Sequence, residues 1–241
     1  MTVTALIPAH SRPLMEIAVA SLRRHAPTIR PLVLATHPSC VGVLSVTVPA
    51  LPGGAANHAH ALQYARQLPR DREGYAITMI RGADIIICLD DDTMILSDQF
   101  LPTLLRAFED PKVGAWGAAG IRDPLHPSCI AFRRELFDRV TTFESALPDH
   151  DTTGLAQAEI QTLGYRLVAV PAVRSADGWD VFGDLWAHLG GGVIHAPVSP
   201  LRRAWRHLKA AAGSEAARDL IVKAKMRERW LDHYDLSSTR L

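Results

Sequence analysis

The chain has 241 residues, of which 48% are hydrophobic and 21% are charged, a composition typical of a globular protein with a buried core. Its formal net charge of +1 excludes a protein that binds polyanions over its whole surface. Cys40, Cys88 and Cys129 form no C-x-x-C pair, which excludes a zinc ribbon or a disulfide framework and favours a reducing, cytoplasmic setting.

The first half of the chain alternates short apolar runs with amphipathic stretches, beginning at the N-terminus. Since Met1–Pro8 lacks a basic region and a long apolar stretch, we expect a first strand there and no signal peptide. The alternation predicts a mostly parallel sheet built of βαβ units, and therefore an α/β fold. The expected strands are Val3–Ile7, Leu32–Ala35, Val43–Val48 and Ile85–Leu89, and the expected helices are Leu14–His25 and Ala55–Gln67.

The second half continues this pattern up to about residue 171. The expected helices are Asp98–Phe108, Arg134–Val140 and Asp151–Leu163, and the expected strands are Val113–Ala119, Cys129–Phe132 and Arg166–Val170. Asp151 or Thr152 is the expected N-cap of the third helix. Residues 172–200 are rich in Gly, Pro and Trp and show no clear period, so no element is predicted there.

No linker rich in Pro or Ser interrupts the chain, and no apolar run approaches the ~18 residues of a membrane span. We therefore expect no transmembrane segment and one domain over residues 1–200. A basic helical tail over residues 201–241 is expected to pack on it.

Three adjacent carboxylates, Asp90, Asp91 and Asp92, directly follow the unbroken apolar strand Ile85–Leu89. Like charges repel and lose hydration when buried, so such a cluster needs a neutralising partner. Ligands of open α/β sheets bind outside the carboxyl ends of the strands, and carboxylates with substrate phosphates are the usual ligands of Mg²⁺ or Mn²⁺. The cluster therefore predicts a divalent cation bridging to a diphosphate. The competing interpretation is a solvated acidic turn that caps the following helix.

Four segments in this order resemble the GT-A-fold, family-2-like glycosyltransferases with a D-x-D motif. They are Leu6–Pro13, Ala83–Asp92, Pro127–Phe137 and Thr162–Leu167, and the resemblance covers roughly residues 3–195. It implies an enzyme that uses Mn²⁺ or Mg²⁺ to move a sugar from a nucleoside-diphosphate-sugar donor to a hydroxyl acceptor. The acceptor class stays open among glycans, lipid-linked molecules, small molecules and modified DNA bases.

The resemblance also implies roles for individual residues. Pro8, Ala9 and Arg12 would line the nucleotide pocket, Asp90 would contact the donor ribose or the metal, and Asp92 would ligate the metal. Asp91, the middle residue of the motif, is assigned to the donor site. Many relatives carry an acidic residue after the second strand that touches the base, but residues 35–38 of this chain contain none, which leaves the identity of the nucleotide open.

Inverting relatives use a carboxylate near the start of the helix before the Gly-Tyr-Arg strand as a general base, within hydrogen-bond reach of the acceptor hydroxyl. By its distance from Gly164, Asp151 is the first candidate for this base and Asp149 the second. Two alternatives stay open: Asp151 is only a helix N-cap, or the enzyme is a retaining one that needs no such base.

The segment from Trp186 to His195 contains three consecutive glycines, which permit close approach to a ligand. In several GT-A enzymes a histidine from the C-terminal part completes the metal shell. His188 and His195 suit that role because neutral imidazole is a good Mn²⁺ ligand. The alternative is a tight turn with incidental histidines.

The tail carries nine Lys/Arg and three Asp/Glu between Arg202 and Arg229, a net charge of +6. Such a helix can pack on the domain, lie on an anionic membrane surface, or contact nucleic acid phosphates, as in an enzyme that glycosylates modified DNA bases. A nucleotidyltransferase of related fold is the alternative enzyme class. It would need a Gly-rich loop like G-x-G-T-R after the first strand, which residues 8–12 do not provide. The non-catalytic alternative is a nucleic-acid-associated protein that works through the tail.

Overall fold

The computed structural model describes residues 1–42, 44–49, 54–68, 74–120, 123–144, 152–174 and 180–188. The predictions for Asp149, Asp151, His195 and the basic tail lie outside the described residues. Within them, no helix is long and apolar enough to cross a membrane.

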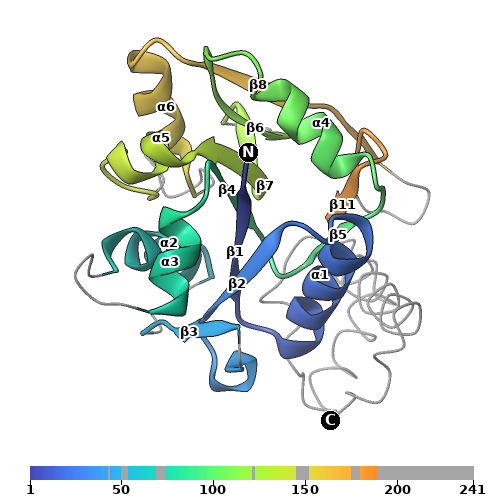
Figure 1. Ribbon diagram of the computed structural model, residues 1–241, viewed down its shortest axis with the longest axis vertical. Helices are drawn as coiled ribbons and strands as arrows, with labels where there is room; N and C mark the ends of the chain where they lie inside the picture. Colours follow the sequence, from blue (N-terminus) through green and yellow to red (C-terminus); the bar gives the residue numbers. More distant parts are fainter. Residues whose placement is uncertain are drawn as a thin grey trace, which may run out of the picture.

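A seven-stranded sheet in the order β3-β2-β1-β4-β7-β6-β8 forms the centre of the molecule (Figure 1). β7 runs antiparallel to both of its neighbours, and the other strand pairs are parallel. The strands are β1 (Val3–Ala9), β2 (Arg30–Ala35), β3 (Ser45–Thr47), β4 (Ile85–Leu89), β6 (Val113–Ala119), β7 (Leu125–Arg133) and β8 (Arg166–Val170). The predicted mostly parallel α/β architecture is therefore confirmed.

The central strands are apolar at every position because both faces of the sheet are covered. In β4, Ile86 and Cys88 point into one core, whereas Ile85, Ile87 and Leu89 point into the other, and all five are buried. This is the expected behaviour of a parallel strand buried on both faces. It also explains why β4 could be predicted with its exact bounds.

Helices cover the two faces in separate groups (Figure 1). On one face lie α2 (Gly54–Gln67), α3 (Tyr75–Arg81), α5 (Arg134–Arg139) and α6 (Gly154–Thr162). On the other lie α1 (Arg12–His25) and α4 (Phe100–Ala107), with the short 3-10 helix η1 (Pro38–Cys40) following β2. Because helices cover both faces, a ligand can reach the sheet at the ends of its strands.

A second, antiparallel sheet in the order β5-β11-β10-β9 packs on the face of α1 and α4. Its strands are β5 (Thr93–Ile95), β9 (Ala172–Arg174), β10 (Asp180–Phe182) and β11 (Trp186–His188). Trp186 anchors it against Trp116 and Phe100, with ring centroids 5.2 and 5.8 Å away, and stacks on Phe182. The sheet thereby fixes the C-terminal part of the described chain beside the strand that follows the three aspartates.

The predicted start of the third helix in the second half is wrong. The helix, α6, begins at Gly154, and its N-cap is Thr153, whose side chain makes no capping hydrogen bond. Thr153 has a left-handed backbone with φ of 77°, and its N–H donates to the Phe143 carbonyl at 2.7 Å. The chain is therefore still turning at Thr153, so neither Asp151 nor Thr152 caps this helix.

Candidate metal and donor site

The carboxyl ends of β1, β2 and β4 meet at one edge of the sheet, and β7 begins there. The Asp90 N–H donates to the Ser128 carbonyl at 3.0 Å, and the Thr93 hydroxyl donates to the same oxygen at 3.0 Å. These bonds join the turn after β4 to the antiparallel strand β7. They hold the aspartate motif at the edge where ligands of open α/β sheets bind.

Three side chains at this edge can hold a cation: Asp90, Asp92 and His188. Each offers one ligand atom, and these atoms all lie within 4.8 Å of one another. His188 Nε2 lies 3.2 Å from Asp92 Oδ1 and 3.9 Å from Asp90 Oδ2. Two carboxylate oxygens and one imidazole nitrogen form a donor set suited to Mn²⁺ and similar divalent ions. The structure therefore brings together three of the four predicted metal ligands.

β-sheet register explains how a residue nearly a hundred positions away reaches the motif. β11 pairs with β5, and His188 stands opposite Thr93, the residue directly after Asp92. The sequence analysis did not predict β11, because a three-residue strand leaves almost no pattern in the sequence. The assignment of His188 to the motif nevertheless agrees with this register.

Two of the three side chains in this cluster are buried, so an unbalanced charge there costs free energy. Asp92 is 3% exposed and His188 is 9% exposed, and Asp92 Oδ2 has no hydrogen-bond partner among the described residues. Burial alone would lower the pKa of His188, but Asp92 and then Asp90 outweigh it and raise that pKa to about 9. Neighbouring carboxylates with one buried oxygen left without a partner form an environment that a divalent cation would neutralise.

Asp91 is turned away from this cluster. Its Oδ2 accepts hydrogen bonds from the His10 and Ser11 N–H groups, each at 2.9 Å. Burial, with a contribution from Asp92, raises the pKa of Asp91 to about 7. The side chain therefore ties the loop between β1 and α1 to the end of β4, and the structure does not bring it among the cation ligands.

The other residues assigned to the donor lie at the end of β1 and the start of α1. Pro8 and Ala9 are the last two residues of β1 and are buried, and the Ala9 carbonyl accepts from the Thr36 N–H at 3.0 Å. Arg12 is 57% exposed and pairs with Glu16 at 2.8 Å along the surface of α1. Pro8 and Ala9 thus lie buried at the carboxyl-end edge of the sheet, and Arg12 lies near them on the surface.

Two histidines that the sequence did not single out also face the motif. His58, on α2, lies with Nδ1 2.8 Å from Asp90 Oδ1. His126, on β7, has its ring centroid 5.1 Å from that of His188. Burial would raise the pKa of Asp90, but His58, followed by His188 and His126, outweighs it and lowers that pKa. Imidazoles from three separate elements therefore surround one carboxylate.

A histidine also stands at the end of β2, where the sequence lacks the acidic residue of many relatives. His37 Nδ1 accepts from the Ser39 N–H at 3.2 Å and lies 2.8 Å from the Ser39 hydroxyl. Its ring packs edge-on against His10, with centroids 5.3 Å apart. Because Nδ1 accepts, Nε2 carries the proton of the neutral ring.

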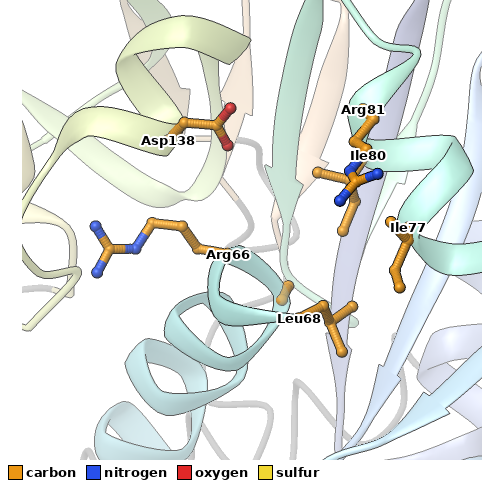
Figure 2. A pocket seen from close by; sticks show the side chains of 7 residues that line it. Arg66, Leu68, Ile77, Ile80, Arg81 and Asp138 are labelled. Atoms are coloured by element: carbon orange, nitrogen blue, oxygen red, sulfur yellow. The ribbon is translucent and has the colours of Figure 1, made fainter. Parts of the chain in front are cut away.

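A small pocket elsewhere in the molecule is separate from this site. Figure 2 shows Arg66, Leu68, Ile77 and Asp138 around it, between the ends of α2, α3 and α5. α3 ends just before β4 begins, and the Arg134 N–H at the start of α5 donates to the Asp84 carbonyl at 3.0 Å. The pocket therefore lies at the amino-end edge of the sheet, opposite the aspartate motif.

No protein-family model matches the sequence, and no curated protein matches it. Among solved structures, the chain is similar to the mannosyltransferase PcManGT from Pyrobaculum calidifontis in complex with GDP-Man and Mn²⁺. The TM-score is 0.51 and the identity 19%, over 99% of this chain and 74% of that one. It also matches, at a TM-score of 0.44 and 14% identity over 82% of this chain and 74% of the other, a Drosophila β-1,4-galactosyltransferase 7 complex with manganese, UDP-Gal and xylobiose. A 2-C-methyl-D-erythritol 4-phosphate cytidylyltransferase from Thermus thermophilus matches at 0.45 and 16%, over 95% and 100% of the two chains.

The first of these likenesses shows the fold. The chain has the GT-A fold, as predicted from the sequence. Within it, the D-x-D pattern of Asp90 and Asp92 lies with His188 in one cluster that can bind a metal ion.

Proposed function

We propose that the protein is a metal-dependent glycosyltransferase, which moves a sugar from a nucleoside-diphosphate-sugar donor to a hydroxyl acceptor. The observation that carries this proposal is the cluster of Asp90, Asp92 and His188 at the carboxyl-end edge of a GT-A fold, with ligand atoms within 4.8 Å. Fold alone does not give a function, but this cluster provides ligands for the divalent cation that the proposed transfer would use. Mn²⁺ or Mg²⁺ held there would stabilise the negative charge that develops on the leaving diphosphate.

The protein groups around the cluster fit a donor with a diphosphate. Asp90, Asp92 and His188 would each offer one ligand atom to a divalent cation, and an ion bound by so few protein groups commonly takes substrate phosphate oxygens as well. The loop between β1 and α1, clamped by Asp91 through the His10 and Ser11 N–H groups, would border the nucleoside. Pro8, Ala9 and Arg12 belong to the same side and keep their proposed place in the nucleotide pocket.

The general base stays a prediction, with Asp151 as the first candidate and Asp149 as the second. α6 begins at Gly154, so both candidates precede this helix in the sequence by a few residues, near the place where the inverting relatives carry their base. We expect Asp151→Asn to lower transfer by ~10²–10⁴-fold and to leave donor affinity nearly unchanged. Loss in Asp149→Asn with normal turnover in Asp151→Asn would move the base by two residues, and full activity in both would contradict an inverting mechanism with such a base.

The direct test is a donor screen. Thermal shifts with nucleoside diphosphates and nucleotide-sugars, each with Mn²⁺, Mg²⁺ or chelator, should show stabilisation that needs donor and metal together. GDP-mannose is a reasonable first donor, because it is bound in the mannosyltransferase of similar fold. Slow hydrolysis of the donor, measured by the release of nucleoside diphosphate, should vanish with chelator and return with metal. No stabilisation by any nucleotide-sugar would contradict the proposal, and release of pyrophosphate from a nucleoside triphosphate and a sugar phosphate would replace it by a nucleotidyltransferase.

A further inference from the structure

His58 touches one of the three proposed cation ligands without being one of them. Its Nδ1 lies 2.8 Å from Asp90 Oδ1, and its side chain is only 13% exposed. A carboxylate accepts hydrogen bonds and cannot donate them when ionised, so Nδ1 carries a proton and donates it to Asp90. A bond of this kind to an ionised group is shorter and stronger than a neutral one. One oxygen of Asp90 is therefore held by α2.

The packing of α2 explains how His58 reaches the motif. His58 precedes Ala61, Leu62 and Ala65 by three, four and seven positions, so all four lie on one face of the helix. The latter three are buried in the core beneath the sheet. Side chains tilt towards the start of their helix, and α2 starts at the carboxyl-end edge. The apolar stripe thus ends in a histidine at the height of Asp90.

This placement is costly unless the imidazole has a specific partner. A polar ring at a core-facing position loses its hydration, and a leucine or alanine would continue the stripe. Among the described residues, His58 Nε2 has no hydrogen-bond partner, so the bond to Asp90 alone compensates the ring. The position is therefore specified by its contact with Asp90.

The two oxygens of Asp90 are divided between two histidines. Oδ1 is held by His58, whereas Oδ2 lies 3.9 Å from His188 Nε2, on the side of the cation cluster. A carboxylate held by one oxygen cannot rotate freely, so it presents the other in a fixed direction. Groups that orient ligands in this way commonly change metal affinity ~10–100-fold.

We infer that His58 is a positioning residue, which holds Asp90 Oδ1 so that Oδ2 is presented to the divalent cation. The inference rests on the cation site of the proposed function and adds a residue that neither the D-x-D motif nor the cation cluster includes. The inference assigns the hydrogen bond to Asp90 to Nδ1 alone, and two conservative variants should therefore behave differently. The amide nitrogen of Asn stands near the place of Nδ1, whereas the longer Gln carries its amide near the place of Nε2.

The test measures binding of Mn²⁺ alone to the full chain, by calorimetry or by the electron paramagnetic resonance signal of the free ion. His58→Ala and His58→Gln should bind Mn²⁺ ~10–100-fold more weakly than the wild type. His58→Asn should recover most of the loss. His60→Ala is the matched control, since His60 lies two positions along the same helix with its Nε2 likewise unpartnered, and it should bind as the wild type does. Melting curves without metal confirm that each variant is folded.

Unchanged Mn²⁺ affinity in His58→Ala would overturn the inference. Equal losses in His58→Asn and His58→Gln would also overturn it, in favour of a packing role of the imidazole. Neither result depends on sugar transfer. A wild-type chain that binds Mn²⁺ with this pattern of variants, yet neither binds nor hydrolyses any nucleotide-sugar, would contradict the proposed function and leave the role of His58 intact.

Discussion

The two ends of β4 both carry aspartates, and they differ in almost every other respect. At the amino end, Asp84 is exposed and accepts hydrogen bonds from the Thr2 N–H at 2.6 Å and the Thr2 hydroxyl at 3.1 Å. At the carboxyl end, Asp91 and Asp92 are 8% and 3% exposed, and Asp92 keeps a buried oxygen without a partner among the described residues. The same side chain thus serves as a satisfied surface contact at one end and as an unsatisfied buried charge at the other.

The difference shows what distinguishes a structural carboxylate from a functional one. Asp84 accepts two hydrogen bonds at Oδ2 from Thr2 and is exposed to solvent, so its charge needs no further partner. The carboxyl-end cluster holds several carboxylates in a buried place, where histidines from three elements of the described chain offset part of their charge. Such an arrangement is costly for folding and is expected where a cation binds. Substitutions at the two ends should therefore have effects of very different size.

The largest effect is expected for Asp92→Asn, which removes a proposed ligand charge at the carboxyl end. Activity that depends on metal should fall at least ~100-fold, since a Lewis-acid contribution of several kcal/mol is lost. The fold should persist, because an amide relieves repulsion from the neighbouring carboxylates. Donor hydrolysis at saturating Mn²⁺, beside a metal-free melting curve, measures both. The paired variant Asp84→Asn should keep full activity, and full activity of Asp92→Asn would remove the distinction between the two ends.

Much of the fold was predictable because long buried strands have a strong signature. β4 and β6 were predicted with their exact bounds because they are unbroken, buried apolar runs of five and seven residues. β8 was also predicted with its exact bounds, although it is only partly buried, because its four apolar residues lie between the Gly-Tyr-Arg segment and Pro171. β7 extends from Leu125 to Arg133, four residues further towards the N-terminus than predicted, because His126 and Pro127 interrupt its apolar pattern. The strands β5, β9, β10 and β11 are three residues each, too short for a period to show.

The site residues that are close together in the sequence could be predicted, whereas most of those that only the fold brings together could not. Asp90 and Asp92 stand together in the sequence, and His188 was expected from its place beside three glycines. His58 was missed because nothing in an alanine-rich helix sets it apart from the nearby His60, although its spacing from Ala61, Leu62 and Ala65 marks it as core-facing. His126 was missed because only the pairing of β7 with its neighbours brings it to the edge. Tertiary contacts of this kind leave no local pattern.

A smaller effect is expected for His188→Ala, which removes the imidazole but leaves both carboxylates. Loss of one ligand should weaken Mn²⁺ binding by ~10–100-fold. Nucleoside-diphosphate affinity should fall with it, because the ion would bridge the two. Calorimetry with Mn²⁺, and with nucleoside diphosphate plus Mn²⁺, tests this coupling. Unchanged affinities would return His188 to the role of a strand residue that only hydrogen-bonds Asp92.

An effect on stability is expected for Asp91, which lies at the carboxyl end but outside the cation cluster. Asp91→Ala leaves the His10 and Ser11 N–H groups without their acceptor and should cost about 1–3 kcal/mol of unfolding free energy. Asp91→Asn keeps a carbonyl oxygen that can accept both bonds, so it should retain most of the stability. Urea unfolding of the two variants measures the difference. Mn²⁺ affinity should stay near that of the wild type in Asp91→Asn, and a loss as large as in Asp92→Asn would place Asp91 among the ligands.

The smallest effect is expected for Asp84→Asn at the amino end, and it should depend on pH. The backbone N–H of Thr2, followed by its hydroxyl, lowers the pKa of Asp84 below the ordinary value. A carboxyl whose pKa is lowered by folding stabilises the fold above the pKa of the unfolded chain, and this contribution is lost as the pH falls through the lowered value. Because Asp84 is exposed, solvent screens the contribution to about 0.5 kcal/mol or less. Asp84→Asn should therefore be slightly less stable than the wild type near pH 7, and the two should converge in acid. Denaturant unfolding at a series of pH values checks this sign, and a difference that grows on acidification would contradict the assignment of Asp84 as a satisfied structural contact.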